Sequence, residues 1–243
     1  ASESGTAIHD GLLEGLDRIV TVDAKDWRTN AAKEQRELAR SIGKIPMLAH
    51  KVANVEAAVN AAKAYVATSE LKGVFDDGAP ERTLIWNEGA VLCKARPDWL
   101  SADQSILLHV KTTQGSAQPD SWIRNQLGPC GYDMALAFYE RGLYAATEGK
   151  GKDAPLSVFL VIEQQAPYGC SLVSLSPAYM ELAVSKVDRA IREWQKCEAS
   201  GMYPAYPKRI AYAEPKPWDV ASEQEAELNG AYDALQEKEG LQI

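Results

Sequence analysis

The chain of 243 residues lacks the features that mark a membrane or secreted protein. No segment approaches the roughly 18 consecutive apolar residues that a transmembrane helix needs. No basic stretch precedes an apolar run in the N-terminal sequence, which begins ASESGTAIHD, so a signal peptide is not predicted. We therefore expect a cytoplasmic protein with no membrane partner.

Cysteine is scarce, and its copies are scattered at Cys93, Cys130, Cys170 and Cys197 with no CxxC pair. Zinc ribbons need paired cysteines at short spacing, so the sequence predicts no such site. An iron–sulfur cluster has no support in this spacing either. Free thiols are the expected state.

Positive charge is in deficit, with 26 Lys and Arg against 34 Asp and Glu and a net charge of -8. A global basic field that draws the protein onto nucleic acid or an anionic membrane is therefore excluded. Any site for a polyanion must be local, in a groove or channel whose positive lining is outweighed by an acidic exterior.

Internal repeats and low-complexity linkers are also absent, which favours one α+β domain over residues 1–218, followed by an acidic, helix-prone tail over 219–243. Helical spacing predicts helices over 8–16, 29–41, 52–66, 131–143 and 177–197. Short β-branched and aromatic runs predict strands over 81–86, 90–100, 105–113, 156–163 and 170–175, the first three as an antiparallel meander. Residues 44–47, which include a proline, are expected to form a connection.

Chemistry-bearing residues gather on two neighbouring predicted strands. Alternate side chains of a strand share a face, so His109, Lys111 and Thr113 are expected to point the same way. Asp98 lies near the same end if the two strands pair across the turn at 100–104. Singly, each residue is more typical of a solvated edge or a turn. Together they form the set that metal-dependent phosphodiester cleavage needs: ligands for a divalent ion and a lysine that positions water and offsets negative charge.

Motifs at fixed order extend this pattern along the chain. They are Gly5-Thr-Ala-Ile-His9-Asp-Gly-Leu-Leu-Glu14, Arg96-Pro-Asp98, His109-Val-Lys111-Thr-Thr113, a tyrosine-rich helix at Tyr132–Tyr139, Val161-Ile-Glu163 with Pro167-Tyr168, and a closing set of Cys197, Gly201, Tyr203–Tyr206 and Pro217-Trp218. In these motifs, over residues 5–218, the chain resembles the RecE-type (exodeoxyribonuclease VIII-like) phage and prophage exonucleases of the PD-(D/E)XK superfamily.

The resemblance implies a PD-(D/E)XK core, which is a central mixed sheet flanked by helices. It implies an exonuclease that uses Mg²⁺ or Mn²⁺ to degrade linear double-stranded DNA from 5′ to 3′ for recombination by strand annealing. The implied partners are double-stranded DNA ends and a single-strand annealing protein. A homo-oligomeric ring around DNA would reconcile the net charge with a basic channel. The implied location is the cytoplasm of a bacterial host, with a phage or prophage origin.

Individual roles follow by carry-over onto matching positions. The expected assignments are metal ligation by His9, Asp98 and His109, catalysis by Lys111 with Asp98 and His109, phosphate contacts by Arg96 and Thr112, and supporting roles for Glu163 and Tyr132.

Two positions depart from the family pattern. His109 stands where the third motif has a carboxylate, and Ala135 stands where the tyrosine-rich helix usually has glutamine. Mg²⁺ prefers oxygen ligands, whereas imidazole suits Mn²⁺, Fe²⁺ or Zn²⁺. His109 is then a ligand with an altered metal preference, a natural or engineered inactivation, or a polar group hydrogen-bonded to Asp98 without metal. Three functions stay open: an active exonuclease, a catalytically weakened or inactive DNA-end-binding or assembly protein, and a nuclease-fold protein acting on another nucleic acid.

Overall fold

A computed structural model describes residues 3–147, 149 and 154–230. The chain divides into two compact units, Ala1–Gly201 and Met202–Ile243, which are described separately. The domain boundary expected at residue 218 stays a prediction, and residues 231–243 of the expected tail lie outside the described ranges.

The helices of the first unit are α1 (Glu3–Leu13), α2 (Asn30–Ser41), α3 (Ala49–Ala67), α4 (Pro119–Trp122), α5 (Tyr132–Ala146) and α6 (Pro177–Ser200), with a 3-10 turn at Leu16–Arg18 and a π-helical turn at Ile123–Leu127. The strands are β1 (Ile19–Val22), β2 (Ile45–Leu48), β3 (Gly78–Pro80), β4 (Leu84–Glu88), β5 (Val91–Ala95), β6 (Trp99–Ser101), β7 (Ile106–Thr113), β8 (Leu156–Glu163) and β9 (Cys170–Ser174). All five predicted helices are confirmed. The sequence reading missed α4 and the turn that follows it.

A five-stranded sheet in the order β3-β6-β7-β8-β9 forms the centre of the first unit. The β7–β8 pair is parallel and the other pairs are antiparallel, so the sheet is mixed and the predicted α+β class is confirmed. The predicted meander is only partly right. The β4–β5 hairpin forms its own two-stranded sheet, because Trp86 and its neighbours pack against α5 instead of extending the central sheet.

The prediction of a connection at residues 44–47 is wrong, because these residues form most of β2, which pairs in parallel with β1. Pro46 lies opposite Val20 in this pair. A proline lacks the N–H that a central strand needs, but it is tolerated in an edge strand, and a two-stranded sheet consists only of edges. The proline therefore misled the sequence reading.

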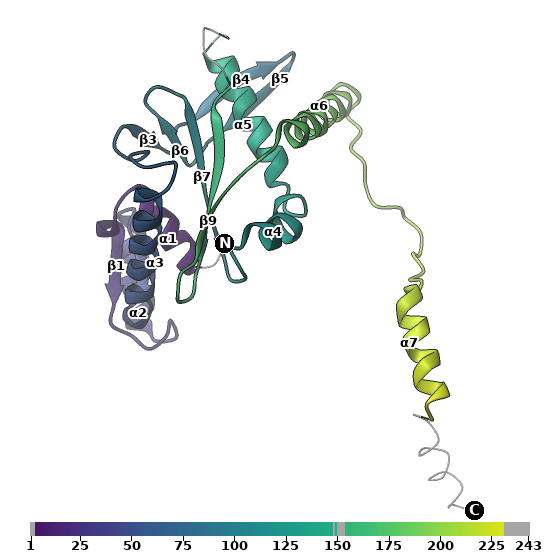
Figure 1. The fold of residues 1–243 in the computed structure, drawn as a ribbon, viewed down its shortest axis with the longest axis horizontal. Coiled ribbons are helices and arrows are strands. Elements are labelled where there is room, and N and C mark those ends of the chain that lie inside the picture. Colours follow the sequence, from purple (N-terminus) through teal and green to yellow (C-terminus); the bar gives the residue numbers. More distant parts are fainter. Residues whose placement is uncertain (1–2, 148, 150–153, 231–243) are drawn as a thin grey trace, which may run out of the picture. The chain divides into compact units, whose positions relative to one another are not determined.

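Both faces of the central sheet are covered by helices, as Figure 1 shows. On one face, α1 and α3 pack against Leu108, Val110 and Leu160. On the other, residues of α4 and α5 pack against Phe159 and Val161. Strands covered on both faces read as nearly continuous apolar runs, which is the sequence pattern of β8. A polar group on β7 or β8 is therefore buried unless it lies at a strand end.

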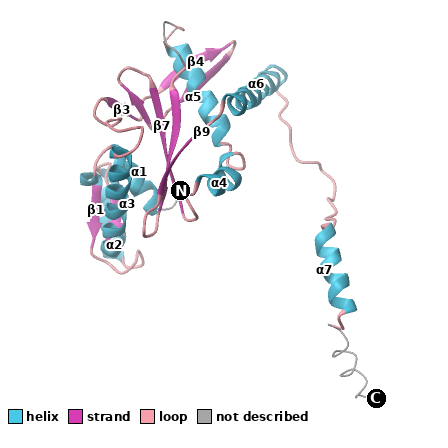
Figure 2. Cartoon of the chain, in the orientation of Figure 1, coloured by secondary structure: helices cyan, strands magenta, loops and turns pink. Residues whose placement is uncertain are grey.

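In the second unit, the described residues comprise an extended segment followed by α7 (Pro217–Leu228), as Figure 2 shows. Large apolar side chains are exposed along it, including Tyr206, Tyr212 and Trp218. None of the helices in the described part of the chain combines the length and hydropathy that a bilayer span requires.

Candidate functional site

His9 is placed by the packing of α1. The flanking residues Ala7, Ile8 and Leu12 are buried in the core beneath α3 and β7, which fixes the rotation of the helix. His9 therefore lies at the border of the buried face, with 22% of its side chain exposed. Its Nδ1 atom lies 2.9 Å from Asp10 Oδ1, which leaves Nε2 directed toward the sheet.

The close pairing of β3 with β6 places a second acidic side chain next to Asp98. Pro80 lies opposite Trp99, and a Cβ atom at Gly78 would lie 2.7 Å from the Leu100 oxygen, so this approach requires glycine. Directly after Pro80 the backbone turns at Glu81, whose φ is 56°. The Glu81 N–H donates a 3.0 Å hydrogen bond to the Asp98 carbonyl oxygen, so the two residues lie side by side.

Asp98 joins the strands that the sequence analysis expected to pair, because β6 and β7 are antiparallel neighbours. Its Oδ2 accepts a 2.8 Å hydrogen bond from the Val110 N–H and lies 3.5 Å from Lys111 Nζ. Its Oδ1 lies 3.5 Å from His9 Nε2. The two oxygens of this carboxylate thus face different neighbours.

His9, Glu81 and Asp98 form a group with the composition of a metal site. One ligand atom from each lies within 4.8 Å of the others. Metal–ligand bonds of about 2.0–2.2 Å place two ligands of one ion at most about 4.4 Å apart, so small side-chain rotations bring these atoms within reach. An imidazole and two carboxylates therefore fit a divalent cation. Glu81 was not predicted, because nothing in its local sequence distinguishes it from a turn residue.

The charges in this group perturb one another strongly. Burial opposes protonation of His9, but hydrogen bonds and charges from Asp10 and Asp98 outweigh it and raise the pKa to about 9. Burial likewise opposes ionisation of Asp98, and the hydrogen bond to His9 with the charge of Lys111 lowers its pKa to about 2. In the metal-free protein the pair is therefore ionic at neutral pH.

His109 is fully buried and lies beside the group of three. Its ring stacks on Tyr139 at a centroid distance of 4.8 Å, and Nδ1 lies 4.0 Å from Asp98 Oδ2. Neither ring nitrogen has a hydrogen-bond partner, so the alternative in which His109 is hydrogen-bonded to Asp98 is wrong. Burial lowers its pKa to about 4, which leaves the ring neutral.

Lys111 lies on the same side of β7 as His109, as alternation predicted, but nearer the strand end and partly exposed. Its Nζ lies 5.4 Å from the centre of the Tyr132 ring. That ring stacks on Trp122, so α5 and the core beneath it hold the aromatic face toward the ammonium group. Lys111 Nζ therefore has both the Tyr132 ring and the Asp98 carboxylate as neighbours.

The remaining predicted residues divide between the site and its surroundings. Arg96 Nε lies 2.6 Å from Glu81 Oε2. Thr112 Oγ1 accepts a 3.0 Å hydrogen bond from Gln164 Nε2. Glu163 Oε1 instead accepts from the Ala117 N–H at 2.8 Å and so holds the loop after β7, with no described contact to His9 or Asp98.

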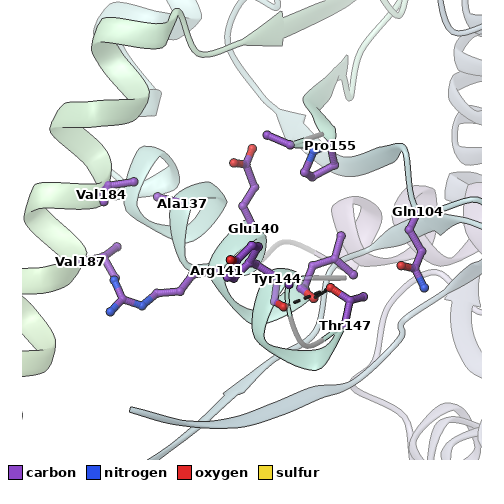
Figure 3. A pocket seen from close by; sticks show the side chains of 12 residues that line it. Gln104, Ala137, Glu140, Arg141, Tyr144, Thr147, Pro155, Val184 and Val187 are labelled. Carbon is purple, nitrogen blue, oxygen red and sulfur yellow. Dashed lines mark hydrogen bonds between the residues drawn. The ribbon is translucent and has the colours of Figure 1, made fainter. Parts of the chain in front are cut away.

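Two cavities lie apart from these residues. One has a volume of about 370 Å³. It is lined by residues of α5, α6 and the loop before β8 and by Gln104, and Figure 3 shows these side chains. The other, of about 660 Å³, runs between β5, α5 and α6. Neither is lined by His9, Glu81, Asp98 or Lys111. The side chains of the group and of Lys111 are partly exposed, each by less than a quarter.

The model of a family described as a PDDEXK-like domain of unknown function (DUF3799) matches residues 3–216. The chain belongs to this family. The sequence has a Pro-Asp pair at Pro97-Asp98, and Lys111 follows two residues after His109.

A crystal structure described as "Putative exonuclease", from Eubacterium rectale, is similar to the PDDEXK-like chain with a TM-score of 0.52 and 12% sequence identity. The match covers 90% of this chain and 79% of that one. At this identity the likeness establishes a shared fold. No curated protein matches the chain in sequence.

Proposed function

We propose that the chain is a RecE-type exonuclease that uses a divalent metal ion to degrade linear double-stranded DNA from 5′ to 3′. The observation that carries the proposal is the sharing of one carboxylate, Asp98, between a metal-competent group and Lys111. A lysine ammonium 3.5 Å from a ligand carboxylate can act on water or phosphate at the same centre.

Each side chain has a task in this proposal. His9 and Asp98 bind the metal ion, which when bound polarises the scissile phosphate and lowers the pKa of water. Lys111 Nζ positions the attacking water and offsets the negative charge that develops on phosphate. Arg96 and Thr112 contact the DNA backbone, Tyr132 orients Lys111, and Glu163 supports the loop after β7.

The wider context of the proposal rests on the motif order over residues 5–218. It comprises a nuclease domain over 1–218, Mg²⁺ or Mn²⁺ as cofactor, a homo-oligomeric ring around DNA, and an annealing protein that takes up the 3′ single strands. The cytoplasm of a bacterial host and a phage or prophage origin belong to the same proposal.

The second candidate is a catalytically weakened or inactive DNA-end-binding or assembly protein of the same fold. The observation that favours it is the loss of the motif carboxylate at His109, where a neutral, fully buried ring replaces a charged ligand.

Degradation of 5′-labelled linear duplex DNA separates the two candidates, with Mg²⁺ and Mn²⁺ tested in turn and a closed circular duplex as the control for end dependence. We expect the parent chain to degrade the linear DNA with Mn²⁺ and to leave the circle intact. A silent parent whose cleavage appears in the His109→Asp variant identifies a site disabled at one position. If neither the parent nor the His109→Asp variant cleaves DNA but both still bind DNA ends, the result supports the assembly protein.

A further inference from the structure

We infer that Glu81 is the third protein ligand of the metal centre and supplies the carboxylate that position 109 lacks. The inference deepens the proposed function, on which it rests for the presence of a metal ion. In this inference the carboxylate ligand comes from Glu81, in the turn after β3, and not from position 109 on the central strand β7.

The charge of the site requires such a group. Position 109 carries an imidazole and no carboxylate, so without Glu81 the described group His9, Glu81 and Asp98 would have one acidic ligand, Asp98, with the cations Lys111 and Arg96 close by. A single carboxylate beside two cationic side chains is a poor environment for a divalent ion. A second carboxylate restores the negative charge that hard cations require.

The geometry places Glu81 where that carboxylate is needed. Glu81 Oε1 lies 3.8 Å from His9 Nε2, and both belong with Asp98 to the group whose ligand atoms lie within 4.8 Å of one another. The side chains of His9, Glu81 and Asp98 are 22%, 24% and 14% exposed. An ion can therefore reach all three from solvent.

The position of His109 argues independently for this exchange. Its ring approaches Asp98 at Oδ2, whereas His9 approaches at Oδ1. His109 is 0% exposed, and both of its nitrogens lack hydrogen-bond partners although one of them faces the site. A buried polar ring without a hydrogen-bond partner is destabilising. The His109 ring thus occupies the buried position where the resemblance places a carboxylate. Glu81 lies on the solvent-accessible side of the site.

Two further contacts hold Glu81 in position. Its left-handed backbone, with φ of 56°, is unfavourable for a residue with a Cβ atom, and the bond from its N–H to the Asp98 carbonyl oxygen maintains it. Arg96 Nε lies 2.6 Å from Oε2 and leaves Oε1 on the side of His9. Arg96 is therefore a positioning residue for Glu81.

One imidazole and two carboxylates form a mixed nitrogen and oxygen set, which suits Mn²⁺ better than Mg²⁺. The test therefore measures Mn²⁺ binding to the purified full chain by titration calorimetry, without DNA. The variants are Glu81→Gln, His109→Phe and, as a matched surface control, Glu193→Gln, whose carboxylate pairs only with Lys196 among its described hydrogen bonds. Melting of each metal-free variant checks the fold.

Glu81→Gln is expected to weaken Mn²⁺ binding at least about tenfold, because losing a ligand costs no less than losing a residue that hydrogen-bonds to a ligand and orients it. Glu193→Gln should stay within about threefold of the parent. His109→Phe keeps the stack on Tyr139 and breaks no hydrogen bond, so its affinity should fall at least tenfold less than that of Glu81→Gln. If phenylalanine does not fit, His109→Gln takes its place.

Unchanged Mn²⁺ binding in Glu81→Gln overturns the inference, as does an equal loss in the His109 variant or a parent that binds no Mn²⁺. These outcomes are distinct from failure of the proposed function. Glu81-dependent Mn²⁺ binding by a parent that cleaves no DNA supports the ligand set and refutes the exonuclease. DNA cleavage by a parent whose Mn²⁺ affinity is indifferent to Glu81 does the reverse.

Discussion

Two clusters of charged side chains in the first unit differ in how many of their carboxylate oxygens are used in short hydrogen bonds or ion pairs. In the first, Arg141 of α5 is held between Glu88 of β4 and Asp188 of α6. Its Nη2 donates a 2.9 Å bond to Glu88 Oε2, its Nε bonds the other oxygen of Glu88, and its Nη1 bonds Asp188. The cation bonds both oxygens of Glu88 and one of Asp188, and so links the β4–β5 hairpin to α5 and α6.

In the second cluster, the contacts of Asp98 with His9, Lys111 and His109 span 3.5 to 4.0 Å. Good hydrogen bonds to charged groups are shorter, near 2.7–2.9 Å. The difference teaches what each cluster is for. Arg141 uses its donors on protein acids and stabilises the fold. Around His9, the Val110 N–H and Arg96 occupy one oxygen each of Asp98 and Glu81. The other oxygens, Asp98 Oδ1 and Glu81 Oε1, lie 3.5 and 3.8 Å from His9 Nε2 and are available to a cation from outside.

The largest effect should follow from changing Lys111, which separates chemistry from metal binding. Lys111→Met removes the ammonium but none of the ligands, so DNA cleavage should fall at least about 10²–10³-fold while Mn²⁺ binding persists. Rates on labelled duplex, together with calorimetry, check both parts. Cleavage within a few-fold of the parent would refute a catalytic role for the lysine.

A residue of this site can be predicted from the sequence where its position is determined by residues nearby in the chain, and not where it depends on distant ones. Alternation along β7 correctly places His109 and Lys111 on one side, and the short turn before β7 correctly predicts its pairing with the strand that follows Asp98. The burial of His109 could not be predicted, because it depends on Tyr139 of a helix about 30 residues later. Glu81 escaped for the same reason, since only the β3–β6 register brings it to Asp98.

A smaller effect, on stability alone, should follow from changing the first cluster. Arg141→Met leaves Glu88 and Asp188 without their cation, and the three side chains are partly exposed, so we expect a loss of about 1–3 kcal/mol in the free energy of unfolding. Urea denaturation measures it. The affinity for Mn²⁺ should equal that of the parent. A marked change in this affinity would contradict the conclusion that the Arg141 cluster serves stability and not metal binding.

The smallest effect is a pH dependence of the same cluster. The Arg141 hydrogen bond lowers the pKa of Glu88 below its ordinary value of 4.5, although partial burial opposes this. A carboxyl whose pKa is lower in the folded than in the unfolded state stabilises the protein at pH values above its unfolded-state pKa. This stabilisation is lost as the pH falls through the folded-state pKa. The stability difference between the parent and Glu88→Gln should therefore shrink on acidification below about pH 4.5, in urea titrations at several pH values. A difference that stays constant would show that the pair does not titrate with folding.

Gly78 extends the metal centre beyond the residues that face it. A Cβ atom there would collide with the Leu100 carbonyl and the Trp99 indole, and β3 would have to retreat from β6. Since Glu81 follows three residues later and is anchored to the same strand end, that retreat would carry a carboxylate away from His9. The affinity of the centre for a metal ion thus depends on Gly78, a residue with no side chain. A substitution at Gly78 is expected to weaken metal binding although every charged residue of the site is kept.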